Sequence, residues 1–154
     1  MVVYRAFGAP DRLAVARRLR RITRRLGLKL LIGSDWRLAA AVGADGVHLP
    51  QRLMRGAPDL RRRRPGWLIS AAAHDAAAIV AGNRMGLDAL LVSAVFPIRS
   101  PSAGRALGPL RFAALTIRSR APVIALGGVN DVTARRLRSS GAAGLAAVDG
   151  FTRR

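Results

Sequence analysis

The chain contains no cysteine, and this absence excludes several kinds of chemistry. Without thiols there is no disulfide framework, no thiolate metal site and no cysteine nucleophile. Long apolar runs are also missing, because none approaches the ~20 residues that a membrane-spanning helix needs. The first residues meet charge too soon to form a secretory signal. We therefore expect a cytoplasmic protein with no membrane partner.

Lysine and acidic residues are scarce. Lys29 is the single lysine, and 8 acidic residues face 27 basic ones, which gives a net charge of +19. Such a charge favours an acidic partner such as nucleic acid. The only dense basic block, at 61–64, has no interleaved aromatic residues on which bases could stack. We interpret the charge as a solvated arginine-rich surface and do not expect a nucleic-acid partner. A catalytically inactive, nucleic-acid-binding domain is the less favoured alternative.

Short apolar runs alternate with amphipathic segments along the whole chain, which indicates repeated βαβ units and a parallel sheet in one domain, 1–154. The predicted strands cover 2–4, 28–32, 46–49, 67–71, 89–93, 123–126 and 144–148. The predicted helices cover 11–26, 35–42, 52–62, 75–85, 109–120 and 131–140. Seven strands are one short of an eight-stranded barrel. A doubly wound open sheet gives the same alternation and stays an alternative.

Four segments carry a resemblance to a known family: 41–49 (AVGADGVHL), 70–74 (SAAAH), 95–97 (VFP) and 123–129 (VIALGGV). In this order they resemble thiamine phosphate synthases and their thiazole tautomerase relatives over nearly the whole chain. The resemblance implies an α/β fold, a parallel (β/α)8 TIM-type barrel that lacks its first β/α unit and most of its last helix. Because an unclosed barrel exposes strand edges, we expect this chain to be a dimer or poorly soluble, and an upstream strand and helix to stabilise it.

The resemblance also implies an activity in thiamine biosynthesis. The transferase branch joins an aminopyrimidine methyl diphosphate to thiazole phosphate and releases pyrophosphate. By alignment, Arg5 and His74 are the catalytic candidates. The candidates for binding substrate or phosphate are Arg99, Ser100, Arg105, Gly127, Gly128 and Val148. Beside these candidates the chain departs from the family where Phe7 replaces a lysine and where Asp149 replaces a small hydroxyl residue.

The glycine pair also suggests a phosphate site on physical grounds. Gly127 and Gly128 follow a buried strand and precede Asn130 and Asp131 at a predicted helix start. Backbone amides at such a turn can face an anion, and the last βα loops of barrels commonly bind phosphate. The alternative is that the two glycines only make a tight turn.

Magnesium is implied only if the transferase reading holds, and most of its ligands are missing. The family's asparagine–aspartate pair aligns with Gly33 and Ser34, and its second aspartate aligns with Leu53. Asp35 could contact magnesium, but we favour its role as a helix N-cap. Asp45 precedes a strand and belongs to the opposite face of the barrel. We therefore predict no metal-binding residues from this sequence.

Histidine occurs twice. His74 lies just past a strand end, where catalytic residues of barrels collect, and aligns with a histidine that the tautomerase branch uses for proton transfer. The alternative is that His74 only bonds the backbone at a helix start. We interpret His48 as a packed core residue. A metal-free thiazole tautomerase, or another phosphate-ligand-binding barrel, is therefore the second functional hypothesis.

Overall fold

The computed structural model describes residues 1–5, 8–98 and 105–148. Within these residues, seven parallel strands form one sheet in chain order. They are β1 (Val2–Tyr4), β2 (Leu30–Gly33), β3 (Gly46–Leu49), β4 (Leu68–Ala73), β5 (Ala89–Val92), β6 (Val123–Ala125) and β7 (Gly144–Leu145). Sequential parallel neighbours are the order of a barrel wall rather than of a doubly wound sheet, whose order reverses at a switch point.

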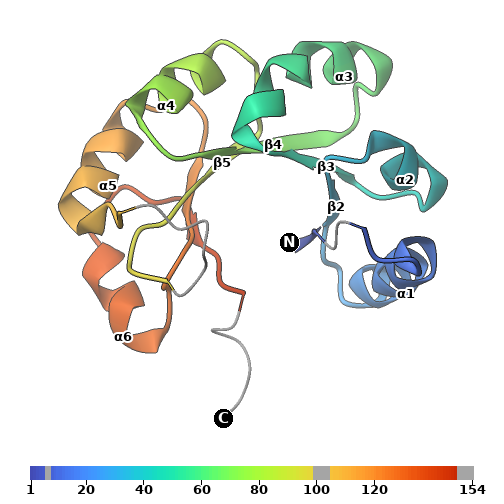
Figure 1. The fold of residues 1–154 in the computed structure, drawn as a ribbon, viewed down its shortest axis with the longest axis horizontal. Helices are drawn as coiled ribbons and strands as arrows, with labels where there is room; N and C mark the ends of the chain where they lie inside the picture. The colour runs from blue at the N-terminus through green and yellow to red at the C-terminus, as the bar shows by residue number, and fades with distance from the viewer. Residues whose placement is uncertain (6–7, 99–104, 149–154) are drawn as a thin grey trace.

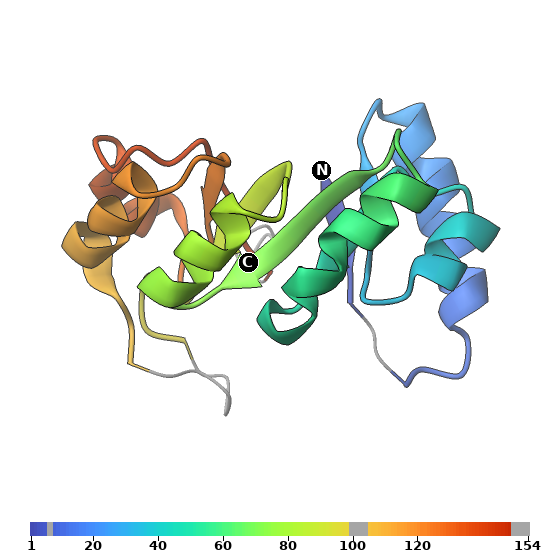
Figure 2. The ribbon, with the colours of Figure 1, turned by 90° about the horizontal axis from the view of Figure 1, so that it is seen from above.

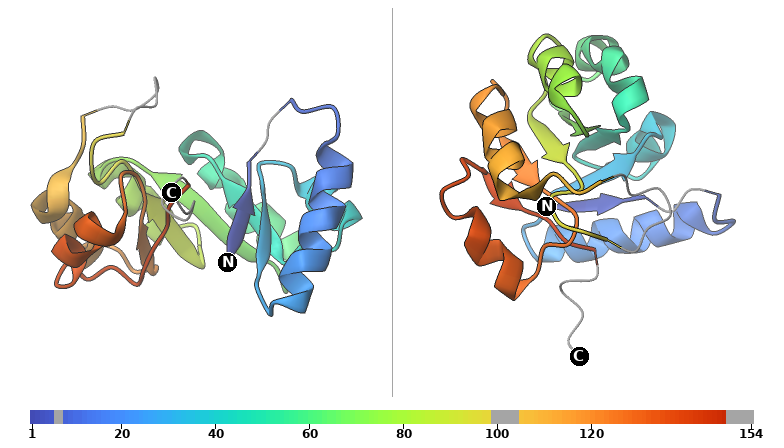
Figure 3. Two further views of the ribbon diagram at one scale, coloured as in Figure 1. Left: turned by 90° about the horizontal axis from the view of Figure 1, so that it is seen from below. Right: turned by 60° about the vertical axis from the view of Figure 1, so that its left-hand side comes forward.

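The helices confirm this choice. They are α1 (Arg12–Arg25), α2 (Trp36–Ala41), α3 (Ala57–Arg63), α4 (Ala76–Asn83), α5 (Gly108–Ile117) and α6 (Asp131–Ala134). All six lie along the convex outer side of the curved sheet (Figure 1). Seen from above, α3 and α4 lie over the outer face of β4 (Figure 2), and Figure 3 shows the sheet curving inside this arc. The fold is therefore a partial TIM-type barrel. None of the helices in the described residues is long and apolar enough to cross a membrane.

Helix caps show where sequence reasoning succeeds and where it does not. Asp35 accepts a hydrogen bond from the Leu38 amide at the start of α2, and Asp75 accepts one from the Ala78 amide at the start of α4. Both caps were expected. The expected cap at Asp11 is wrong, because its side chain makes no capping hydrogen bond although it holds the N-cap position of α1.

The single helix expected over 52–62 is a second error. The structure contains a 3-10 helix, η1 (Gln51–Gly56), followed by α3 from Ala57. Pro58 lies in the first turn of α3, where its missing N–H costs nothing. A proline at that point cannot continue an earlier α-helix, so the chain divides into two short helices. The helix expected over 131–140 also divides, into α6 and the 3-10 helix η2 (Arg135–Leu137).

Both faces of the sheet are buried at its central strands, as expected for strands lined by helices outside and by side chains inside, whereas β1 and β7 at its edges are only partly covered. β2 and β3 are buried along their whole lengths. The wall is tight at Gly46, where an added Cβ would lie 1.8 Å from the carbonyl oxygen of Leu68. Only glycine fits at this first position of β3.

Two aspartates fasten the amino-terminal ends of the strands in the same way. The Asp45 amide donates to the Leu30 carbonyl, and its Oδ2 accepts the Leu30 amide at 2.9 Å. Asp88 repeats this exchange with Ile69, whose amide lies 2.7 Å from Oδ2. An arginine accompanies each carboxylate at 2.6 Å, Arg20 at Asp45 and Arg61 at Asp88. As expected for Asp45, these contacts lie on the face opposite the strand ends that carry the candidate site.

Candidate functional site

The carboxyl ends of β4, β5 and β6 bring their following segments into contact. The amide of Val95, after β5, donates to the Leu126 carbonyl at 3.0 Å. The Phe96 amide donates to the Gly127 carbonyl, also at 3.0 Å. The segment after β5 therefore runs along the segment after β6, which places the VFP and GGV motifs side by side. This is the face on which barrel enzymes carry their active sites.

The structure explains why glycine occupies positions 127 and 128, a question that the sequence alone left open. Gly127 and Gly128 have φ values of +92° and +66°, a region that favours glycine. A Cβ at Gly128 would lie 2.6 Å from Cβ of Phe96, and one at Gly127 would lie 2.9 Å from Cα of Ala94. The tight-turn interpretation is therefore confirmed. Phosphate binding by the same backbone stays a prediction, and the two roles are compatible.

The start of α6 offers little to an anion. The side-chain oxygen of Asn130 accepts from the amides of Val132 and Thr133, both at 3.0 Å. The Thr133 hydroxyl accepts in return from the Asn130 amide, which completes a capping box. Since the amides of Val132 and Thr133 serve this cap, the turn at Gly127 and Gly128 is the better candidate for holding a phosphate at this end of the barrel.

His74 lies immediately after β4 and contacts β5 through its ring. Its Nδ1 lies 2.7 Å from the Ser93 carbonyl oxygen and 3.3 Å from the Ser93 hydroxyl. A carbonyl only accepts, so Nδ1 carries a hydrogen and Nε2 is the nitrogen that can take up a proton. His74 thus makes the hydrogen bond to the backbone that the alternative interpretation expected. It also leaves the ring suited to proton transfer.

His48 is the core histidine that the sequence indicated. It is 4% exposed, and its Nδ1 lies 3.0 Å from the Ser70 hydroxyl. Burial, with a smaller contribution from the positive charge of Arg5, lowers the pKa of His48 to about 4. The positive charge of Arg5, which directly follows β1, therefore acts on the buried imidazole of His48.

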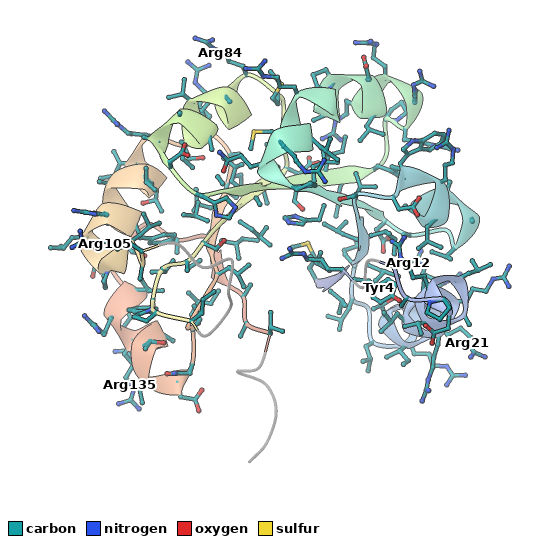
Figure 4. All side chains as sticks on the ribbon, in the orientation of Figure 1. Tyr4, Arg12, Arg21, Arg84, Arg105 and Arg135 are labelled. Atoms are coloured by element: carbon teal, nitrogen blue, oxygen red, sulfur yellow. The ribbon has the colours of Figure 1, made fainter. Side chains whose placement is uncertain are left out.

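The remaining candidates are spread around the barrel. Arg105 is exposed ahead of α5, and Figure 4 shows it on the opposite side of the barrel from Tyr4 and Arg12. Val148, three residues after β7, is 80% exposed. Arg99 and Ser100 lie outside the described residues, as do Phe7 and Asp149. The structure thus brings His74 close to the glycine-pair segment, through Ser93, and leaves Arg105 at the rim.

The described residues do not fit a magnesium site of the kind that the family resemblance implies. Both oxygens of Asp35 are engaged: Oδ1 with the Leu38 amide at 2.9 Å and Oδ2 with Arg12 Nη1 at 3.3 Å. Ser34, at the position of a family aspartate, carries only a hydroxyl. Across the described part of the chain there is no group of three or more His, Asp or Glu side chains that could hold a metal ion.

Sequence reasoning missed Gln51 and Ser93. The Gln51 side chain accepts from the His74 amide at 3.0 Å, and Ser93 provides the carbonyl that anchors the ring. Gln51 comes two residues after β3, and Ser93 comes directly after β5. A polar side chain at or just past the end of a predicted strand was the signal that could have identified them.

Comparisons with known proteins agree with this fold. The model of the thiamine monophosphate synthase family matches residues 1–151. A thiamine-phosphate synthase of Chloroflexus aurantiacus is 34% identical over 152 residues, 96% of this chain and 69% of that protein. One from Geobacillus kaustophilus is 32% identical over 149 residues, 93% of this chain and 65% of that protein. This chain thus spans just under two thirds of the Geobacillus relative's length.

A solved structure supports the same assignment. Thiamine phosphate pyrophosphorylase from Pyrococcus furiosus superposes with a TM-score of 0.81 at 27% identity, over 95% of this chain and 70% of that chain. The curved parallel sheet, the paired loops after β5 and β6 and the match over residues 1–151 all lead to one conclusion: the chain belongs to the thiamine monophosphate synthase family.

Proposed function

We propose that this chain acts in thiamine biosynthesis as a transferase that joins an aminopyrimidine methyl diphosphate to thiazole phosphate. The observation that carries the proposal is the contact between the VFP and GGV segments at the carboxyl ends of β5 and β6, beside His74. The names of the relatives from Chloroflexus and Geobacillus support it. The substrate partner is accordingly a small phosphorylated heterocycle, and the cytoplasmic location stays a prediction.

The reaction forms one bond and breaks one. The thiazole nitrogen attacks the methylene carbon of the pyrimidine, a C–N bond forms, and the C–O bond to the diphosphate breaks with release of pyrophosphate. Positive charge near the leaving group stabilises the charge that develops on it. In this chain Arg5 and Arg105 are the arginines assigned to that role, and the amides of Gly127 and Gly128 are assigned to the thiazole phosphate.

The test is pyrophosphate release with both precursors, with and without added magnesium. Arg5→Gln and Arg105→Gln should each lower the rate, because each removes a cation assigned to the leaving group. Arg84→Gln, an exposed position beyond α4, is the matched control and should leave the rate unchanged. Full activity in both arginine variants would remove these side chains from the diphosphate site. No turnover in the wild-type chain would overturn the transferase proposal.

A second candidate, thiazole tautomerase, is favoured by one observation, the fixed ring of His74. Tautomerisation moves one proton between two positions of the same molecule, so it requires a base that later returns the proton and requires no metal. His74→Gln should lower such an activity by about 10² to 10⁴, the usual contribution of a proton carrier, with little effect on affinity. Unchanged turnover in this variant would eliminate the candidate.

Ligand binding can be tested apart from turnover. A ligand that binds only the folded chain must raise its melting temperature. Thiazole phosphate and thiamine phosphate should both do so in buffer without inorganic phosphate. An unmoved transition at saturating ligand would show that the glycine-pair segment is not a phosphate site.

A further inference from the structure

Gln51 connects the segment after β3 to the segment after β4. It is the first residue of η1, and its half-buried side chain makes two hydrogen bonds to consecutive residues. Its Oε1 accepts from the His74 amide at 3.0 Å, and its Nε2 donates to Oδ2 of Asp75 at 3.4 Å. The residue that precedes α4 and the residue that caps it are thus both held by one amide.

An amide side chain suits this pair of contacts because it carries both an acceptor and a donor. The His74 main chain offers a hydrogen, which needs an acceptor, and the Asp75 carboxylate offers lone pairs, which need a donor. A glutamate at position 51 would accept from His74 but would face Asp75 with a like charge. Asp75 cannot turn away freely, because its Oδ1 caps α4 through the Ala78 amide at 2.7 Å.

The ring of His74 is held from a second direction. At 2.7 Å the Ser93 carbonyl is the closer partner of Nδ1, and two lone pairs at that distance would repel. The tautomer with hydrogen on Nδ1 is therefore the one that fits. Ser93 directly follows β5, so His74 is anchored at its main chain from the segment after β3 and at its ring from the segment after β5. A shift of the main chain would break the Nδ1 contact.

We propose that Gln51 is a positioning residue for His74. By holding the His74 main chain, it keeps the ring donating from Nδ1 to Ser93, so that Nε2 is the nitrogen that exchanges a proton with a bound heterocycle. For the proton exchange and the identity of that ligand, the inference rests on the second candidate function, the thiazole tautomerase. The tautomer and its dependence on Gln51 are properties of the protein alone.

The test uses the small number of histidines. The chain has two, so the ring signals of a ¹⁵N,¹³C-labelled sample can be assigned with the single variant His74→Gln. In the wild-type chain at neutral pH, the His74 ring should show the ¹⁵N and ¹³Cδ2 shifts of the Nδ1–H tautomer. Gln51→Leu, which removes both contacts, and Gln51→Glu, which reverses one of them, should move His74 toward a mixture of tautomers.

Turnover gives an independent readout. In the Gln51 variants the kcat of thiazole tautomerisation should fall by about tenfold to 10²-fold, the cost of misplacing a reacting group by about 1 Å, while KM stays within about twofold. Arg52→Gln, the exposed next residue, should change neither the tautomer nor kcat. An Nε2–H tautomer in the wild-type chain, or a Gln51→Leu variant with the wild-type tautomer, would overturn the inference. A chain inactive on every thiazole precursor would refute the proposed function, while the spectra would still decide the role of Gln51.

Discussion

Arg12 Nη1 lies 3.3 Å from Oδ2 of Asp35 and so spans from the first turn of α1 to the N-cap of α2. This contact neutralises the carboxylate that follows the carboxyl end of β2. The other oxygen of Asp35 is committed to the Leu38 amide. Both carboxylate oxygens of Asp35, which could have contacted a divalent cation, therefore already have partners within the protein.

We predict that the chain binds divalent cations weakly. Manganese titrated against the wild-type chain and followed by its electron paramagnetic resonance should show no saturable site. Ser34→Asp combined with Leu53→Asp, which restores carboxylates at the two aligned family positions, should create one. Ser34 has a φ of 61°, and aspartate tolerates this region better than most residues. Saturable binding by the wild-type chain would contradict the prediction.

His48 should make the fold sensitive to mild acid. Its pKa is lowered to about 4, from 6.5, mainly by burial and secondarily by Arg5. Between these values the unfolded chain binds a proton that the folded chain does not, so the free energy of unfolding falls as pH is lowered through this window. The full loss is about 3 kcal/mol, since each pKa unit corresponds to about 1.4 kcal/mol.

Urea unfolding at a series of pH values measures this loss. His48→Asn should be less stable at neutral pH but should lose less stability between about pH 6.5 and 4 than the wild-type chain. His74→Gln should keep the His48 contribution, because it leaves the core unchanged. A wild-type chain with constant stability across the window would show that His48 becomes charged without cost.

Gly128 should tolerate no side chain. Gly128→Ala places a Cβ 2.6 Å from Cβ of Phe96 at a φ of +66°, so we expect a destabilisation of roughly 1–3 kcal/mol. Gly66→Ala is the control, since nothing lies within 4 Å of its added Cβ. It should be neutral or slightly stabilising. Equal melting temperatures for the two variants would show that the segment after β5 moves aside for the added Cβ at little cost in stability.

The outer face of α5 should promote self-association. Leu110 and Ile117 are 87% and 85% exposed, and Ala114 lies exposed between them on the same stripe. We predict a dimer that forms with rising concentration in sedimentation velocity and that Ile117→Arg prevents. Arg111→Gln, beside the stripe, should not prevent it. A wild-type chain that stays monomeric at every concentration would refute the prediction.

The sequence predicted the order of the elements well because each buried strand and its helix carry a local pattern. β3 matches its predicted range at both ends, and the cap at Asp75 follows from one residue type before an apolar run. The site was harder to predict. Gln51 and Ser93 act on His74 from neighbouring strands, and no local pattern reports which strand ends meet. The ion pair between Asp35 and Arg12, which lie 23 positions apart, is equally non-local.

The matched contacts of Asp45 with Leu30 and of Asp88 with Ile69 repeat the same anchor in two strand pairs of the barrel wall, β2 with β3 and β4 with β5. Burial alone would raise the pKa of Asp45, but the Leu30 amide, Arg20 and Lys29 together hold it below its usual value. Its contribution therefore persists in weak acid and fades only when the pH falls below about 4. In hydrogen exchange, the amides of Leu30 and Ile69, each held by a carboxylate, should open together with their strand pairs rather than fray from the strand ends.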